Sequence, residues 1–208
     1  LLALLINEIR NTKFKRAVQT ISYMPYFISM VIICGLIKTF CQSDGIITDL
    51  VVALGGERVN LLASKNWFYP IYIISNIWQN IGWDSIIYLA ALAGIDQEQY
   101  EAARVDGAGR IRQIISVTLP GLMPTITILF ILKMGNILNV GFEKILLLYS
   151  PTTYEVADVI STYVYRIGIL DANFSYSTAI GLVNSVVNII FLLLTNAISK
   201  KMNNSGLF

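Results

Sequence analysis

The 208-residue chain contains no histidine, only two cysteines and five prolines, and 13% of its residues are charged. The absence of histidine excludes an imidazole general base and the usual histidine-containing zinc site. The patterns GxxxxGK[ST] and GxSxG are also missing, which excludes a phosphate-binding loop and a serine nucleophile elbow of these types. We therefore expect no catalytic residue, no metal site and no cofactor on this chain.

The two cysteines and the basic residues are also too few for other common roles. Cys34 and Cys41 are seven residues apart, so a continuing helix separates them by about 10 Å, beyond the reach of a disulfide. We expect both to be inert packing residues. Lysine and arginine together number 15, and membrane topology explains their placement, so the sequence gives no support for nucleic-acid binding.

Apolar residues, by contrast, are abundant and grouped in blocks. They make up 55% of the chain, and the mean hydropathy is +0.65, far above the value for soluble proteins. About 20 helical residues cross a hydrocarbon core of about 30 Å, so the blocks predict an all-α polytopic membrane protein in contact with lipid. The opening LLALLI resembles the end of a span, so we expect an N-terminally incomplete domain with one partial and four full spans. The expected spans are residues 1–6 (partial), 17–38, 70–93, 121–142 and 178–199.

Charge placement predicts the orientation of these spans. When the four full spans cross the membrane in alternating directions, nine basic residues lie on one side of it. The other side receives only four basic residues and most of the acidic residues. Positive residues favour the cytoplasmic face, so we expect both chain ends and the loop of about residues 96–120 to be cytoplasmic, in a bacterial plasma membrane. The nine are Arg10, Lys13, Lys15, Arg16, Arg104, Arg110, Arg112, Lys200 and Lys201.

The polar loop between the second and third full spans, EAARVDGAGRIRQIISVTLP, is too long and too patterned for a simple turn. Ala102 and Ala103 leave a bare helix surface that another protein can approach closely. Gly107 can take a positive φ and end a helix, and Pro120 suits the start of the next span. The candidate coupling residues are Glu101, Ala102, Ala103, Asp106, Gly107, Ala108, Leu119 and Pro120.

This pattern resembles the EAA loop of binding-protein-dependent ABC importer permeases. Residues 7–29 and 67–109 are most similar to the maltose-type carbohydrate branch, in particular to permeases of lipoprotein-linked complex-polysaccharide uptake. The resemblance covers residues 1–208 and implies a single transmembrane domain with the type I importer fold. It also implies a second homologous permease, an external substrate-binding lipoprotein, and two ATPase subunits that hold ATP and magnesium and dock on Glu101–Ala108.

Polar residues recur at helical spacing inside three of the expected spans. Lipid cannot satisfy such stripes, which must therefore face protein or water. They could line a solute path or simply make hydrogen bonds between helices. An indole beside amides suits a sugar, because the ring stacks on C–H groups and amides both donate to and accept from hydroxyls. The candidate pathway residues are Asn76, Asn80, Trp83, Asp84, Asn136, Asn139 and Asn184.

Asp84 and Lys133 are charges within expected spans, where each costs about 2.5–3.5 kcal/mol at the centre of the bilayer. They either mark a pathway or form an ion pair that joins two helices. Their presence argues against a neutral maltose-like sugar. The sequence thus predicts a permease for an oligosaccharide or polysaccharide fragment. The alternatives are a permease for another solute, a secondary transporter that uses Asp84 as an ion site, or a membrane scaffold.

Overall fold

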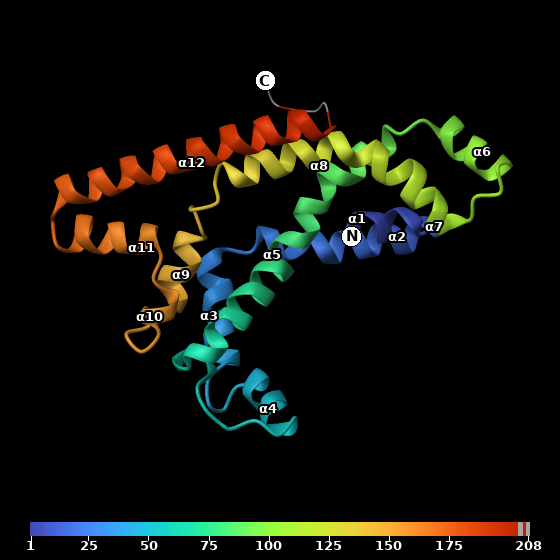
Figure 1. Cartoon of the computed structure of the whole chain (residues 1–208). Helices are drawn as coiled ribbons and strands as arrows, with labels where there is room; N and C mark the ends of the chain where they lie inside the picture. The colour runs from blue at the N-terminus through green and yellow to red at the C-terminus, as the bar shows by residue number, and fades with distance from the viewer. Residues whose placement is uncertain (204–205, 207–208) are drawn as a thin grey trace. The chain divides into compact units, whose positions relative to one another are not determined.

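The computed structural model describes residues 1–203 and residue 206, and helices are its only regular elements within that part of the chain (Figure 1). In chain order the elements are α1 (Leu2–Glu8), α2 (Thr12–Tyr23), η1 (Met24–Phe27), α3 (Met30–Phe40), α4 (Ile46–Ala53), η2 (Leu61–Ala63), α5 (Lys65–Ala93), α6 (Gln97–Val105), α7 (Arg110–Gln113), η3 (Ile114–Thr118), α8 (Leu119–Met134), α9 (Phe142–Leu148), α10 (Tyr154–Ala157), α11 (Ile160–Tyr165), η4 (Arg166–Leu170) and α12 (Phe174–Asn203).

These helices form two compact units. The first unit contains Leu1–Tyr26, Asn80–Gly135 and the described residues from Ile189 onward. The second unit contains Phe27–Gln79 and Asn136–Asn188. Helices α5 and α12 contribute residues to both.

The core of the first unit joins the end of α5 to α1 and to the start of α8. Its buried residues are Ala3, Leu92, Ile95, Val117 and Leu122. Helix α2 begins at Asn11, whose side chain accepts hydrogen bonds from the backbone N–H groups of Lys13 and Phe14, as expected of an N-cap. Helix α5 passes so close to α2 that a Cβ at Gly82 would overlap the carbonyl of Ser22.

The core of the second unit brings together α3, the loop after it, the start of α5, and α9. Its buried residues are Cys34, Cys41, Leu61, Leu62, Phe68, Leu148 and Ala157. Both cysteines are free and buried, in agreement with their expected packing role. Burial raises the pKa of the Cys41 thiol to about 11, which keeps that thiol protonated at neutral pH.

Two of the expected spans differ from the helices that form. The expected span 17–38 is broken between α2 and α3, because Pro25 lacks an N–H group and disfavours a continuing α-helix. The expected span 121–142 ends early, at Met134, where Gly135 caps α8 and a turn follows. This segment also begins earlier than predicted, since a continuous helix runs from Arg110 to Met134.

Length and composition identify the helices able to cross a membrane. Among the described residues, Arg110–Met134 and Phe174–Lys201 meet both criteria, and the bent pair Thr12–Phe27 and Met30–Phe40 would make a third span. Helix α5 has 29 residues and contains the whole expected span 70–93, but its polar residues keep it outside this group. A membrane crossing by α5 therefore stays a prediction. The extreme C-terminus lies outside the described residues.

Candidate functional site

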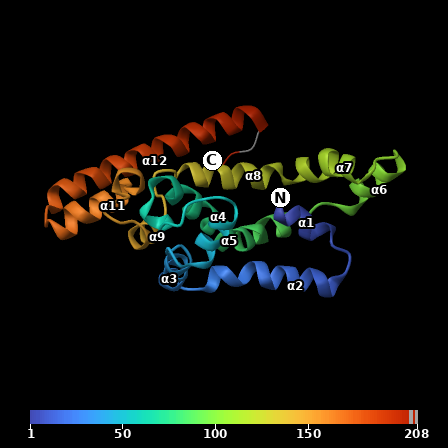
Figure 2. The same ribbon diagram turned by 90° about the horizontal axis from the view of Figure 1, so that it is seen from below.

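The loop with the Glu101–Pro120 pattern lies in the first unit, where α6 and α7 are neighbours (Figure 1, Figure 2). Helix α6 begins at Asp96, whose carboxylate accepts a hydrogen bond from the N–H of Glu98 at 3.0 Å. Its inner face contributes Tyr100 and Ala103 to the core of the first unit. Of the two alanines predicted to form a bare surface, Ala102 is exposed and Ala103 is partly buried against this core.

The outer face of α6 is formed by Glu101, Ala102 and Val105. All three are exposed, and Val105 exposes 88% of its surface. A charged residue beside a small one and an unburied valine make this a surface suited to contact with another protein.

Helix α6 ends in a Schellman motif centred on Gly107. The N–H of Ala108 donates to the carbonyl of Ala103 at 2.9 Å, and the N–H of Gly107 donates to the carbonyl of Arg104 at 3.0 Å. Gly107 has a φ of +77°, in the left-handed region that favours glycine. The predicted positive φ at this residue is confirmed.

A π-helical turn, η3, joins α7 to α8 and is fixed to α6 by side chains. The Tyr100 and Thr118 hydroxyl groups form a hydrogen bond of 3.0 Å, and the Gln113 side-chain amide donates to the Ala108 carbonyl at 2.7 Å. Thr118 is buried. Leu119 and Pro120 follow directly after this turn, at the start of α8 and inside the continuous helix from Arg110 to Met134.

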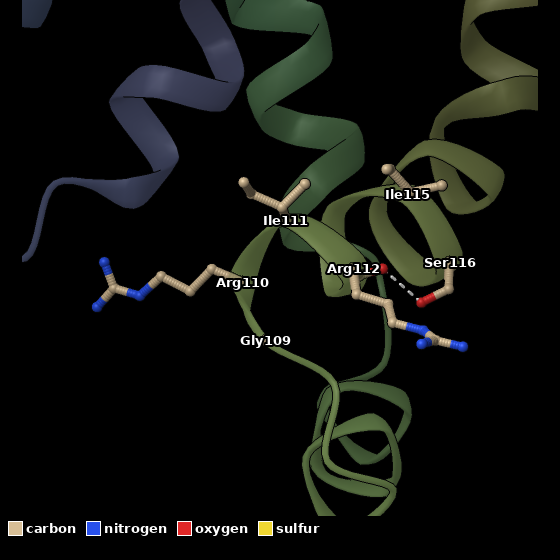
Figure 3. Close-up of a pocket in the computed structure, with 6 residues that line it drawn as sticks. All are labelled: Gly109, Arg110, Ile111, Arg112, Ile115 and Ser116. Carbon is tan, nitrogen blue, oxygen red and sulfur yellow. Dashed lines mark hydrogen bonds between the residues drawn. The ribbon is translucent and has the colours of Figure 1, made fainter.

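The start of this long helix also exposes an apolar pair. Ile111 and Ile115 are one helical turn apart and expose 76% and 62% of their surfaces. Figure 3 shows both isoleucines on one side of the ribbon, while Arg110 and Arg112 extend in opposite directions from it. The Ser116 hydroxyl donates to the Arg112 carbonyl at 2.6 Å.

The candidate pathway residues on α5 lie on one continuous helix, as predicted. Asn76 is exposed and Asn80 is half-buried. Trp83 stacks on Tyr26 with ring centroids 4.5 Å apart and planes 3° from parallel, and 41% of its surface stays exposed. One face of the indole is therefore occupied by another aromatic ring, which the sequence did not predict.

Three predicted amides meet in the second unit. The Asn184 side chain donates from Nδ2 to Asn139 Oδ1 at 3.1 Å, and Asn139 Nδ2 donates to Asn136 Oδ1 at 3.3 Å. Asn188, which sequence reasoning did not select, accepts from the Leu138 N–H at 3.4 Å. Asn136 and Asn139 lie in the turn after α8, whereas the expected span 121–142 placed both in a helix.

One atom of this amide chain is unsatisfied. Asn184 Oδ1 is buried and has no hydrogen-bond partner in the structure. A buried carbonyl oxygen without a donor costs about 1–3 kcal/mol, so such an atom signals a missing partner. A sugar hydroxyl or a water could supply the donor.

Asp84 and Lys133 are both exposed residues of the first unit. In the described part of the chain the ion pairs are Asp49–Arg58, Lys65–Glu155 and Asp158–Arg166. Asp84 and Lys133 thus do not form the structural ion pair that the sequence left open.

A buried lysine escaped the sequence analysis. Lys144 is only 1% exposed, and its Nζ lies 3.5 Å from Gln79 Oε1 and 5.8 Å from the ring centroid of Tyr72. The charge pattern alone predicted a solvated residue in an outer loop. The sequence did contain a signal of its burial, because Lys144 lies two residues after a Gly-Phe pair and is followed by a run of leucines.

The whole chain can be compared with known proteins. Residues 1–204 match the family described as "Binding-protein-dependent transport system inner membrane component". The polygalacturonan/rhamnogalacturonan transport system permease protein YteP of Bacillus subtilis (strain 168) is 46% identical over 209 residues, covering 100% of this chain and 65% of the relative. Protein LplB of the same organism is 46% identical over 209 residues, covering 100% of this chain and 66% of that protein. The chain therefore spans slightly less than two thirds of these relatives.

Solved structures give the same result for the fold. A bacterial alginate ABC transporter, in complex with an alginate pentasaccharide-bound periplasmic protein, contains a chain that matches with a TM-score of 0.95 and 48% identity. The match covers 99% of this chain and 72% of that one. A second structure, of a bacterial ABC transporter involved in the import of the acidic polysaccharide alginate, matches with a TM-score of 0.93 and 49% identity. This match covers 97% of this chain and 71% of that one. The predicted all-α permease fold is confirmed, and the chain belongs to the family of binding-protein-dependent transport system inner membrane components.

Proposed function

We propose that this chain is the permease subunit of an ATP-driven importer and forms part of the membrane path for an acidic oligosaccharide or polysaccharide fragment. Family membership supports the importer role, and the names of the similar proteins support the substrate class, since both polygalacturonan and alginate are polymers of uronic acids. The partners in this proposal are a second homologous permease, two ATPase subunits and an external substrate-binding protein.

Coupling to the ATPase uses the outer face of α6. Glu101, Ala102 and Val105 are exposed there, and the Gly107 turn sets the direction in which that face points. ATP and magnesium are held by the ATPase subunits. The nine clustered basic residues support a cytoplasmic location for this loop and for both chain ends, in the bacterial plasma membrane.

The observation that carries the sugar site is the amide chain of Asn136, Asn139 and Asn184. It ends in the buried, unpaired acceptor Asn184 Oδ1, and a sugar hydroxyl is a donor that would satisfy it. The proposal also includes three polar or aromatic residues of α5, Asn76, Asn80 and Trp83, as candidate sugar contacts. A site built on hydroxyl hydrogen bonds discriminates strongly, because a wrong solute leaves polar groups unpaired.

Lys133 supplies the positive charge that a uronic acid requires. It is exposed and has no carboxylate partner among the described residues, so its ammonium group is available to an anionic sugar. Charge-assisted hydrogen bonds to carboxylates are about twice as strong as neutral ones.

The test is uptake into proteoliposomes that contain the full-length permease pair, the ATPase and the external binding protein. Oligogalacturonate and its neutral methyl ester serve as paired substrates. Lys133→Gln should lower uptake of the acid about tenfold but spare the ester, since the lost interaction is charge-assisted. Asn184→Leu should lower uptake of both. Lys200→Gln, an exposed lysine near the end of α12, is the control and should transport normally.

Uptake is normalised to the amount of assembled complex. Normal transport by both Lys133→Gln and Asn184→Leu would overturn the proposed path. Uptake driven by a pH gradient without the ATPase, and abolished by Asp84→Asn, would replace the importer with a secondary transporter.

A further inference from the structure

A polar groove lies on the inner side of the Glu101–Pro120 loop, within the first unit. It has a volume of about 560 Å³ and is lined by the junction of α1 and α2, the end of α5, the inner face of α6, and the start of the long helix at Arg110. Tyr100 and Thr118, which share a hydrogen bond of 3.0 Å, are among its lining residues. We call this the inner groove.

The inner groove carries an excess of positive charge. Arg10, Arg104 and Arg110 line it, and Glu8 is its single acidic residue. Within residues 1–203 none of these arginines takes part in an ion pair. Three guanidinium groups from three segments therefore share one hollow with one carboxylate, an arrangement that favours an anion with several acceptor oxygens.

Apolar residues border these arginines. Ile9, Leu92, Ala93 and Ile114 also line the inner groove. The expected span 70–93 ends at Ala93, and the long apolar helix leading into α8 begins at Arg110, so a membrane crossed by both segments would have its boundary at the groove. Basic pockets between helices on the cytoplasmic side of a membrane are suited to phosphate headgroups.

We infer that the inner groove binds a phosphate-bearing anion, with the headgroup of an anionic phospholipid as the ligand that also fits its apolar border. The outer face of α6, which the proposed function gives to the ATPase, is a different surface. The inference stands without the proposed function, because it concerns binding to Arg10, Arg104 and Arg110 and not transport.

A bound phosphate would hold the loop in place. Arg10 precedes α2, Arg104 lies in α6, and Arg110 begins the helix that becomes α8, so one phosphate contacting all three would join these segments. It would also remove the mutual repulsion of three neighbouring cations.

The chain offers a matched control for this site. Arg110 and Arg112 lie two residues apart on the same short helix, but only Arg110 lines the inner groove. In Figure 3 Arg110 extends to the side where the blue N-terminal ribbon lies, and Arg112 extends to the opposite side. Loss of one positive charge is therefore identical in Arg110→Gln and Arg112→Gln, and only its position differs.

The experiment is native mass spectrometry of the full-length transporter complex, titrated with phosphatidylglycerol or phosphatidylcholine. The wild-type complex should retain phosphatidylglycerol in preference to phosphatidylcholine. Arg110→Gln and Arg104→Gln should each weaken its apparent Kd about tenfold, as expected for loss of one charge-assisted contact, while Arg112→Gln stays within about twofold. A parallel thermal-shift titration with inorganic phosphate tests whether the groove binds free phosphate instead of a lipid headgroup.

Each outcome decides the inference. Selective loss of phosphatidylglycerol in Arg110→Gln supports a lipid headgroup, and stabilisation of wild type but not Arg110→Gln by inorganic phosphate supports a free phosphate. Equal weakening in Arg110→Gln and Arg112→Gln would mean general charge attraction and would overturn the site. Dissociation of the ATPase from Arg110→Gln with lipid retention unchanged would also overturn it, by assigning this arginine to the ATPase contact.

Discussion

Replacing Gly107 with valine should uncouple the ATPase from the permease by changing the direction of α6. Gly107 has a φ of +77°, and a Cβ added there would meet no atom within 4 Å. The cost of valine is therefore a backbone cost and not a steric clash with neighbouring side chains. Left-handed backbone costs an L-residue about 1–2 kcal/mol, and a β-branched side chain lies at or above the upper end of that range.

This cost translates into a change of population. A difference of about 1.4 kcal/mol is a factor of ten, so a cost of about 2 kcal/mol or more should make the Schellman turn at Gly107 at least about 30-fold less populated relative to other loop conformations. Transport and sugar-stimulated ATP hydrolysis should fall together in the reconstituted complex. Membrane insertion should stay normal, because no apolar span changes.

Two further variants separate the backbone effect from the effect of a larger side chain. Asparagine tolerates the left-handed region, so Gly107→Asn should retain most of the coupling. Gly109 also has open space around it but a φ of −67°, and it precedes α7 as its N-cap, where serine is favoured. Gly109→Ser should therefore behave like wild type. The reasoning fails if Gly107→Val couples normally, or if Gly107→Asn is as defective as Gly107→Val.

Two more predictions concern stability. Gly82→Ala should lower the free energy of unfolding by about 1–3 kcal/mol, because the added Cβ would overlap the Ser22 carbonyl. Gly35→Ala is the control, because a Cβ at Gly35 would meet no atom within 4 Å. Equal melting temperatures of the two variants would contradict the close crossing of α2 and α5. Asp158 is partly buried, which raises its carboxyl pKa, but hydrogen bonds from Arg166 and Thr162 outweigh this and hold the pKa below its usual range. Its stabilising contribution is therefore present above the unfolded pKa of about 3.9 and is lost as pH falls through the lower folded value. Melting temperature measured against pH should show this acid loss in wild type and less of it in Asp158→Asn; identical pH profiles would refute the assignment.

The sequence predicted those features whose cause is local. The positive φ at Gly107 follows from a glycine after a helical run. The same kind of local reasoning should have found the break at Pro25 and the end of α8 before Gly135. In both cases apolar residues continue beyond the break, so hydropathy alone predicted one uninterrupted span.

The features that the sequence did not predict depend on non-local partners. Tyr100 and Thr118 are 18 residues apart, and their hydrogen bond forms only because the turn at Gly107 brings the helix that begins at Arg110 back beside α6. The stacking of Tyr26 on Trp83 joins residues from two different expected spans. Hydropathy and spacing describe one segment at a time, so they can identify a polar stripe but not the ring or amide that meets it.

The continuous helix from Arg110 to Met134 has a mechanical consequence. Its 25 residues make a rod about 37 Å long, at about 1.5 Å per residue. A rotation of about 5° around its loop end would sweep the opposite end through about 3 Å. That displacement is close to the diameter of a water molecule, so a very small angular movement of the loop would be enough to open or close the proposed solute path beside Lys133.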